Sequence, residues 1–367
     1  MKVACIKEIK DQEFRVGLAP VNVHDYVARG HEVLVESGAG EAINFTDADY
    51  KEAGAKIVST KEAWEAEMII KVKEPLESEF SYFKENQILF TYLHLANEKA
   101  LTEALLAKKV SAVALETIKV GNFLPCLAPM SAIAGRLSIT QGAKYLEKTF
   151  GGNGTLLGGV PSVPKGKVLI LGGGVVGLNA AQMAMGMGAE VTIMDIDMQR
   201  LAYFDQIFGS RINTLYSNTG NIIAAIKECD VLIGSVLIPG AKAPKLVKRE
   251  YLKMMKKGSV IVDVAIDQGG CVESSHPTTH TDPIYIIDGV VHYSVANMPG
   301  AVAKTSSVAL TNATTPYGVQ LASKGLVAAC KENAALLEGL NTHAGKITYK
   351  AVAEAFGMTY HEAASVL

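Results

Sequence analysis

Short apolar runs alternate with segments of helical pattern over the first third of the chain. Alternation of this kind is typical of βα units, in which parallel strands share one sheet and helices cover its faces. We therefore predict an α/β domain over residues 1–130. Its predicted strands are residues 2–6, 32–35, 55–58, 68–72, 87–92 and 113–115.

The middle of the chain predicts a second α/β domain, residues 131–304. A helix-like segment begins at Ser131 and leads to GGNGTLLGGVPSVPKG, whose glycine and proline density indicates an irregular connection. Further apolar runs follow, so the fold class that we predict is α/β with two doubly wound parallel-sheet domains. The predicted strands here are residues 168–171, 190–194, 231–236, 260–264 and 284–287.

The last segment, residues 305–367, is rich in Ala, Leu and Lys and predicts helices without a strand. Helices with no sheet of their own must pack on another domain, and we expect that domain to be the first. The first domain is then discontinuous, with residues 1–130 joined by residues 305–367. A cleft between two such lobes is the expected place for a ligand.

The sequence KVLILGGGVVGLNAAQMAMGMGAEVTIMDID, residues 167–197, follows the order strand, glycine turn, helix, strand and acidic residue. Gly172, Gly174 and Gly177 match the glycines that make the tight turn, admit a pyrophosphate to the backbone and let helix and strand pack closely. The first N–H groups of the helix point at that pyrophosphate. We interpret the segment as a Rossmann dinucleotide site, with a glycine-rich turn that binds nothing as the alternative.

Asp195 ends the second strand of this segment, about 20 residues beyond the glycines. A carboxylate there accepts hydrogen bonds from both ribose hydroxyls and repels a 2′-phosphate, so NAD is the predicted cofactor. Arg200 lies five residues later and could neutralise a phosphate, which keeps NADP as the alternative.

Composition and charge exclude several other classes of protein. The 367 residues exceed the size at which a single core usually stops growing, and 49% hydrophobic with 20% charged residues is ordinary globular usage. A net charge of -2 offers no basic field for nucleic acid, and no apolar stretch reaches the ~20 residues that span a membrane. Five cysteines lie far apart without a C-x-x-C pair, which predicts reduced thiols and a cytoplasmic protein.

No metal site is predicted. His276 and His280 are four residues apart, with Cys271 nearby. The surrounding SSHPTTHTDP is nevertheless typical of a polar loop, and a metal site there is the weaker interpretation.

Four polar residues follow apolar runs, and ligands of open α/β sheets bind beyond the carboxyl ends of the strands. These residues are Arg15 in EFRVGLAP, Lys73 in IIKVKEP, His94 after ILFTYL and Asp267 in VDVAIDQGG. Each alone has an ordinary structural explanation, such as a solvated charge, a capped carbonyl or a braced turn. Together they suit hydride transfer from a small acid to NAD, because a guanidinium and an ammonium bind a carboxylate and an imidazole can exchange a proton near neutral pH.

The chain resembles the alanine dehydrogenase family, which shares its architecture with the α subunit of proton-translocating transhydrogenase and, more distantly, with saccharopine dehydrogenases. The similar segments span nearly the whole chain in the family's order: EFRVGLAP, KVKEP, TYLHLA, LGGGVVG with VTIMDID, VLIPGAKAPKLV, VDVAIDQGG, and VANMPGAV through ALTNAT. Ala303 and Lys304 depart from the Pro-Arg pair expected there, which affects the positioning of a cofactor-side loop but keeps its charge.

The resemblance implies the reversible conversion of L-alanine and NAD to pyruvate, ammonium and NADH. It implies Arg15 and Lys73 as substrate binders, His94 and Asp267 as the catalytic pair, and a homo-oligomer, a hexamer. Together with the glycine turn, the expected cofactor-binding residues are Ser131, Gly172, Gly174, Val175, Gly177, Asp195, Arg200, Ser217, Val236, Leu237, Ile266, Asp267, Asn297, Met298 and Pro299.

In the mechanism that we predict, water attacks the iminium left by hydride transfer, His94 takes a proton from that water, and Asp267 stabilises the cationic intermediates. Two other functions stay open on the residues alone. A transhydrogenase-like subunit would share the glycine turn but would need a membrane span or a membrane partner. A non-enzymatic NAD-binding regulator would keep residues 172–195 without needing Lys73 or His94 at strand ends.

Overall fold

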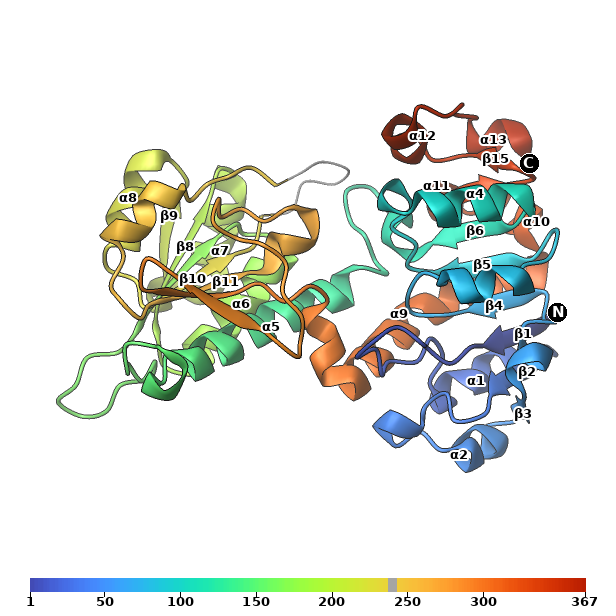
Figure 1. The fold of residues 1–367 in the computed structure, drawn as a ribbon, viewed down its shortest axis with the longest axis horizontal. Coiled ribbons are helices and arrows are strands. Elements are labelled where there is room, and N and C mark those ends of the chain that lie inside the picture. The colour runs from blue at the N-terminus through green and yellow to red at the C-terminus, as the bar shows by residue number, and fades with distance from the viewer. Residues whose placement is uncertain (237–242) are drawn as a thin grey trace. The chain divides into compact units, whose positions relative to one another are not determined.

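The computed structural model describes residues 1–236 and 243–367 of the chain. The described residues form two compact units, the first made of Met1–Met130 with Val302–Leu367 and the second of Ser131–Ala301. The first unit holds an eight-stranded sheet and the second a seven-stranded sheet, each with helices around it (Figure 1). The predicted α/β class with two mostly parallel sheets is confirmed. None of the helices in the described residues is long and apolar enough to cross a membrane.

The sheet of the first unit is doubly wound. Its order is β15-β14-β6-β5-β4-β1-β2-β3, and β1 to β6 are all parallel. The order turns back between β1 and β4, which makes the carboxyl ends of these two strands the switch point of the sheet. The parallel strands are β1 (Lys2–Cys5), β2 (Glu32–Glu36), β3 (Lys56–Val58), β4 (Met68–Ile70), β5 (Ile88–Thr91) and β6 (Ser111–Ala114).

The prediction that residues 305–367 contain no strand is wrong. β14 (Leu340–His343) pairs antiparallel with β6, and β15 (Lys346–Ile347) pairs antiparallel with β14. The sequence of β14, LNTH, has no apolar run, so its pattern alone gives no strand signal. Its strand conformation depends on pairing with β6, more than 200 residues earlier in the chain.

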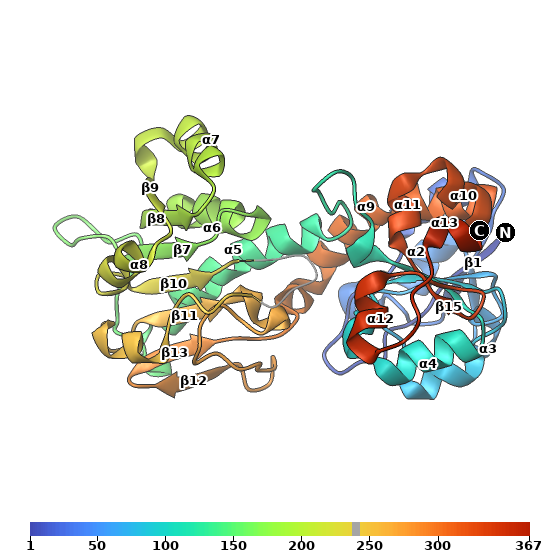
Figure 2. The ribbon, with the colours of Figure 1, turned by 90° about the horizontal axis from the view of Figure 1, so that it is seen from above.

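Helices lie on both faces of the first sheet, as Figure 2 shows with α10 and α11 on one side and α3 and α4 on the other. Local sequence sets several of their starts: Thr46 and Ser59 form capping boxes at the first residues of α2 and α3. The helices of this unit are α1 (Pro20–Val27), α2 (Asp47–Glu52), α3 (Thr60–Ala63), α4 (Lys99–Ala107), α9 (Ala303–Lys324), α10 (Leu326–Glu332), α11 (Ala334–Gly339), α12 (Lys350–Phe356) and α13 (Ala363–Val366).

The second unit has the same order as the first in five neighbouring strands, β11-β10-β7-β8-β9 against β5-β4-β1-β2-β3. Its sheet runs β12-β13-β11-β10-β7-β8-β9, with every neighbour parallel except β12, and the order turns back between β7 and β10. This is the order of the dinucleotide-binding sheet. The strands are β7 (Lys167–Leu171), β8 (Glu190–Asp195), β9 (Asn213–Tyr216), β10 (Val231–Gly234), β11 (Val260–Asp263), β12 (Ile284–Ile287) and β13 (Val290–Tyr293).

Two of these strands are absent from the predicted set, β9 and β13. β9 is a largely exposed edge strand of sequence NTLY, which has no apolar run to predict it. β13 forms a hairpin with β12 through Asp288 and Gly289, both with positive φ. An Asp-Gly turn between two apolar runs is a hairpin signal, so β13 is predictable in principle from IYIIDGVVHY.

The sheet of the second unit is buried on both faces. Alternate residues of β7 enter different cores: Val168 and Ile170 pack with α6 and α7, whereas Leu169 and Leu171 pack with α8. Burial on both faces explains why these strands read as continuous apolar runs. The helices are α5 (Ala128–Tyr145), which starts at the end of the first unit, α6 (Val175–Gly186), α7 (Met198–Phe208) and α8 (Thr219–Ile226).

Candidate active site

Three of the four predicted catalytic and substrate-binding residues lie at one edge of the first sheet. Arg15 is in the loop that follows β1, Lys73 comes three residues after the end of β4, and His94 three residues after the end of β5. Parallel strands end at the same edge, so the topology places these residues at and beside the switch point between β1 and β4. The fourth residue, Asp267, belongs to the second unit.

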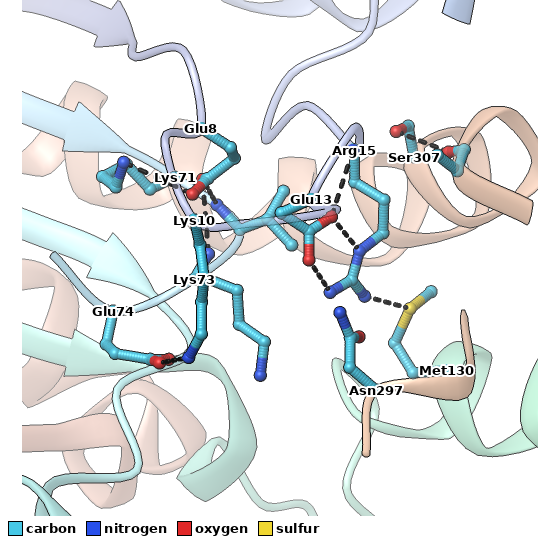
Figure 3. Close-up of polar contacts among 12 residues, drawn as sticks. Glu8, Lys10, Glu13, Arg15, Lys71, Lys73, Glu74, Met130, Asn297 and Ser307 are labelled. Carbon is cyan, nitrogen blue, oxygen red and sulfur yellow. Dashed lines mark hydrogen bonds and ion pairs between the residues drawn. The ribbon is translucent and has the colours of Figure 1, made fainter. Parts of the chain in front are cut away.

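Arg15 is buried and held by a carboxylate from its own loop. Its side chain is 2% exposed, and its Nε and Nη2 donate to the two carboxylate oxygens of Glu13 at 2.7 and 2.5 Å. Nη1 lies 3.3 Å from the sulfur of Met130 (Figure 3). Burial alone would lower the pKa of Arg15, but Glu13 raises it above its usual value, so the guanidinium stays charged.

The loop that carries Arg15 is braced from α9. The backbone N–H of Val16 donates to the hydroxyl of Ser307 at 3.0 Å, and that hydroxyl donates to the carbonyl of Ala303 at 2.8 Å. Figure 3 labels Ser307 beside the loop that carries Arg15. A residue 291 positions later in the chain therefore fixes the backbone next to the guanidinium.

Lys71 forms a buried ion cluster beneath the strand end that carries Lys73. Its ammonium is 2.9 Å from Glu79 and 3.4 Å from Glu8, and all three side chains are almost fully buried. Glu8 also accepts hydrogen bonds from the backbone N–H groups of Val72 at 2.6 Å and Lys73 at 3.3 Å. Glu8 thus fixes both the charge of Lys71 and the backbone that carries Lys73.

Lys73 is the cation of this group that forms no salt bridge in the described residues, although its charge acts on the neighbouring Glu74. In the described parts of the chain its ammonium makes no hydrogen bond or salt bridge, whereas Lys10 pairs with Glu74 and Lys71 with two glutamates. Burial would raise the pKa of Glu74, but Lys73 and Lys10 lower it below its usual value. Figure 3 shows the side chains of Lys73 and Arg15 extending the same way from their loops. A partly buried, unpaired ammonium beside a guanidinium suits an anionic ligand.

His94 has a backbone that few residues adopt. Its φ of 48° and ψ of 34° lie in the left-handed region, and Glu116 holds this turn by accepting from the backbone N–H of His94 at 2.7 Å. Left-handed backbone in a residue other than glycine is found disproportionately at functional sites. The imidazole is 41% exposed and stacks on the ring of Tyr92.

The glycine turn of the second unit has the geometry of a dinucleotide site. Gly172 has a φ of 103°, which favours glycine, and a Cβ on Gly177 would lie 1.9 Å from the carbonyl oxygen of Gly172. Nothing lies within 4 Å of the position that a Cβ on Gly174 would take. No side chain among the described residues caps α6, which begins at Val175. Its first N–H groups can therefore bind phosphate oxygens.

Asp195 ends β8 beside this turn. One carboxylate oxygen accepts from the N–H of Gly173 at 2.6 Å, and the other accepts from the N–H of Asp197 at 2.8 Å. Each oxygen keeps a second lone pair for a ribose hydroxyl. Ser217 lies at the end of β9 and donates its N–H to the carbonyl of Asp195 at 2.9 Å, and the side chain of Arg200 is exposed on α7.

Asp267 lies on the short 3-10 helix η8 (Val264–Gln268) that directly follows β11. Its side chain is exposed, while Ile266 beside it is buried. The following loop is held by Asp263, which accepts from the N–H of Val272 at 3.1 Å, and by Lys245, which donates to the carbonyl of Gly270 at 2.9 Å.

The remaining predicted cofactor residues are placed as follows. Ser131 lies in α5, and Val236 follows β10 next to the switch point. Asn297 has a φ of 64°, and its carbonyl contacts His280 Nε2 at 3.1 Å. Met298 and Pro299 follow it as buried residues of η9 (Met298–Val302), and the prediction for Leu237 falls outside the described residues.

Lys304, which stands where an arginine was expected, lies over the ring of Phe45 with Nζ 5.8 Å from the centroid. Both residues belong to the first unit. The positive charge is thus held by a cation–π contact. His276, a candidate metal ligand by spacing, instead stacks on Tyr285 with centroids 3.8 Å apart, and the described residues hold no group of three or more side chains that could bind a metal ion.

Sequence reasoning missed the carboxylates that hold the candidate residues. Glu13, Glu8 and Glu116 contact Arg15, the backbone of Lys73 and the backbone of His94, respectively. Only Glu13 had a usable signal, because it stands two residues from Arg15 in EFR; the other two act across different strand ends. Acidic residues are ordinarily read as solvated surface groups, and burial that depends on the fold is invisible in the sequence.

The fold and these residues define a two-unit α/β oxidoreductase with a dinucleotide-type sheet. The chain belongs to the alanine dehydrogenase/PNT family: models of its N-terminal and C-terminal domains match residues 4–134 and 138–350. As a member of that family it is an oxidoreductase that uses a nicotinamide cofactor.

Several relatives are similar over nearly the whole chain. The alanine dehydrogenase of Staphylococcus haemolyticus (strain JCSC1435) is 58% identical, with 98% of this chain and 97% of the relative covered. Alanine dehydrogenase 2 of Staphylococcus aureus (strain USA300) is 56% identical, with 98% of each covered. A solved structure of L-alanine dehydrogenase matches with a TM-score of 0.95 and 53% identity over 97% of this chain and 99% of that one. A transhydrogenase from Sinorhizobium meliloti, 24% identical with a TM-score of 0.83 over 96% of this chain and 100% of that one, shares the fold.

Proposed function

We propose that the protein catalyses the NAD-dependent, reversible oxidative deamination of L-alanine to pyruvate and ammonium. The observation that carries this proposal is the pair of cations at the switch point of the first sheet. Arg15 is charged and held in place, and the ammonium of Lys73 forms no salt bridge among the described residues. Such a pair suits a small carboxylate, and the high identity to alanine dehydrogenases supports alanine as the amino acid.

The two units take different roles in this proposal. Residues 1–130 and 305–367 form the substrate domain, and residues 131–304 form the NAD-binding Rossmann domain. The strand order of the second sheet, the crowded Gly177 and the uncapped start of α6 support the second assignment. The cations after β1 and β4 support the first.

NAD is the proposed cofactor because the Asp195 carboxylate stands at the end of β8, where it repels a 2′-phosphate. Arg200 is exposed on α7 and is the residue that would favour NADP instead, by neutralising a 2′-phosphate. When bound, the nicotinamide accepts the hydride from Cα of the substrate. The residues proposed to hold the cofactor are Ser131, Gly172, Gly174, Val175, Gly177, Asp195, Arg200, Ser217, Val236, Leu237, Ile266, Asp267, Asn297, Met298 and Pro299.

The remaining chemistry is assigned to His94 and Asp267. Arg15 and Lys73 bind the carboxylate and the carbonyl side of the substrate, which orients Cα. Loss of hydride from the neutral amine form of alanine leaves an iminium carbon, water adds to that carbon, and His94 accepts the proton that the water gives up. His94 returns this proton to the nitrogen of the adduct, whose collapse releases ammonium and forms the carbonyl of pyruvate. Asp267 stabilises the cationic intermediates through its negative charge.

We also propose a cytoplasmic homohexamer that acts on small molecules only. The five cysteines are buried and unpaired, which suits a reducing compartment. The hexameric state rests on the family resemblance alone. Mass measurement by light scattering during size-exclusion chromatography tests it, since a monomeric mass would exclude it.

The deciding experiment follows NADH formation by absorbance with L-alanine, other small amino acids and lactate as substrates. We expect alanine to be the best substrate and lactate to give no turnover. Preference for lactate would refute amine chemistry, and the absence of turnover with any of them would refute the enzyme assignment. His94→Ala and Asp267→Ala should abolish alanine turnover while retaining the wild-type circular dichroism spectrum, because both side chains are at least partly exposed.

A further inference from the structure

The loop between β1 and α1, residues 6–19, buries two glutamates that the proposed chemistry does not use. Glu8 is 8% exposed and Glu13 is 5% exposed. Glutamate is almost never this buried unless it is paired, because removing a carboxylate from water is costly. Figure 3 shows that the two carboxylates serve different partners: Glu8 contacts Lys71 and Glu13 contacts Arg15.

Glu13 binds one edge of the Arg15 guanidinium. Nε and Nη2 donate to separate carboxylate oxygens at 2.7 and 2.5 Å, and the same carboxylate accepts from the backbone N–H of Arg15 at 3.1 Å. Three contacts between one carboxylate and one residue fix both the position and the rotation of the planar guanidinium. This arrangement leaves little freedom for the Arg15 side chain to reorient.

The Nε–Nη2 edge of Arg15 is not available to a second carboxylate while Glu13 is bound there. Because the guanidinium is planar, fixing this edge also fixes the plane in which its other N–H groups lie. We propose that Glu13 is a positioning residue that holds the guanidinium of Arg15 in the orientation that binds the substrate carboxylate.

This inference rests on the proposed function, because it requires Arg15 to bind the substrate carboxylate. It differs from a purely structural role for Glu13 in one respect. A residue that only stabilises the fold affects all kinetic constants through the amount of folded enzyme, whereas a residue that acts through Arg15 changes the binding of carboxylate substrates selectively.

The test compares Glu13→Gln and Glu13→Asp with a matched control, Glu36→Gln. Glutamine keeps one acceptor oxygen but presents an N–H group to Nη2, so one contact becomes a repulsion and the guanidinium has to turn. Glu36 is also a buried glutamate of the first unit, but it accepts from the backbone of Lys7 at 2.9 Å and from Thr60 at 2.6 Å instead of from Arg15.

We expect Glu13→Gln to raise KM for both L-alanine and pyruvate about tenfold or more, with KM for NAD within about twofold of wild type. Glu13→Asp keeps the negative charge on a shorter side chain, so its KM values for L-alanine and pyruvate should lie between those of the wild type and Glu13→Gln. It also provides the test if Glu13→Gln does not fold. Glu36→Gln should lower the melting temperature and leave all three KM values unchanged.

A double-mutant cycle with Arg15→Lys decides whether Glu13 acts through Arg15. Lysine keeps the charge but cannot make the two-point contact, so Glu13→Gln should change kcat/KM for alanine far less in that background than in the wild type. Independent, multiplying effects would overturn the inference, as would unchanged KM values in Glu13→Gln and Glu13→Asp while wild-type enzyme oxidises alanine. A wild-type enzyme that oxidises no alanine would overturn the proposed function first, and this inference with it.

Discussion

At the scale of single residues, charge pairing decides which cations are structural and which can meet a ligand. Lys71 and Arg15 are buried against glutamates, whereas the ammonium of Lys73 has no such partner among the described residues. Removing one member of a buried pair leaves the other charged in a poorly solvated place. Substitutions at these positions therefore affect stability as well as substrate binding.

Arg15→Ala illustrates the two effects together. We expect kcat/KM for alanine to fall by roughly tenfold to a hundredfold or more, because one charge-assisted contact is lost. Glu13 would also be left unpaired, so unfolding free energy from urea titration should fall by about 3 to 5 kcal/mol. Steady-state kinetics under conditions where the variant is folded separates the two effects. Wild-type stability in this variant would contradict the buried pair, and wild-type kcat/KM would contradict the substrate contact.

Asp195→Ala tests the choice of cofactor at the scale of one carboxylate. Removal of the negative charge should raise the ratio of kcat/KM for NADP over NAD by at least about tenfold. Asp197→Ala is the control, because Asp197 caps α7 by accepting from Gln199 at 2.8 Å and lies only two residues away. The control should lose stability and keep the NAD preference. A wild-type enzyme that already uses NADP equally well would exclude this role for Asp195.

At the scale of elements, α6 packs so closely on the glycine turn that no side chain larger than that of glycine fits at Gly177. Gly177→Ala would place Cβ 1.9 Å from the carbonyl oxygen of Gly172, so helix and turn must separate. We expect weaker NAD binding by calorimetry and a lower melting temperature. Gly186→Ala, at the last residue of the same helix, meets nothing within 4 Å and should be neutral or slightly stabilising. Equal effects of the two substitutions would contradict the close packing.

The edge hairpin of the second sheet contains a histidine that makes folding sensitive to acid. His292 on β13 is buried, with Nε2 2.8 Å from Ser274 Oγ and Nδ1 3.0 Å from the carbonyl of Val290. Burial lowers the pKa of His292 from its usual value near 6.5 to about 4. Between these values the unfolded chain binds the proton and the folded chain does not, so stability falls as the pH falls from about 6.5 to about 4.

The unfolding free energy should fall by on the order of 2 to 3 kcal/mol because of His292 as the pH falls from about 6.5 to about 4. Urea titrations at several pH values measure it. His292→Gln should show a shallower fall in unfolding free energy over the same interval, whatever its stability at neutral pH. An identical slope in the variant would show that other groups cause the acid sensitivity.

At the scale of the whole molecule, the same strand order serves two kinds of ligand site. Each sheet turns back next to its first strand, but the second unit has a glycine turn there and the first has buried charges. If the second unit binds NAD in the folded state only, NAD at about 100 times its Kd should stabilise the protein by about 2.7 kcal/mol. Thermal melts with and without NAD check this, and Gly177→Ala should reduce the shift.

The sequence was informative where local chemistry decides the structure. Gly172 and Gly177 are predictable because the turn they make admits no other side chain, and Lys73 because it follows the apolar run that forms β4. β14 was not predictable, since its burial comes from pairing with β6. Nor was the pairing of Glu8 with Lys71, because the two residues approach each other only when β1 and β4 become neighbours. Long-range pairing is thus the part that one sequence does not reveal.

The contact between Val16 and Ser307 has a consequence for how the protein matures during synthesis. The guanidinium is encoded near the beginning of the chain, but the helix that braces its loop follows the whole of the second unit. A nascent chain can therefore complete its continuous second unit before the first unit, which needs residues up to Leu367. Partly made molecules should therefore acquire the capacity to hold a dinucleotide before they can hold an amino acid, so an unfinished polypeptide is not a working catalyst.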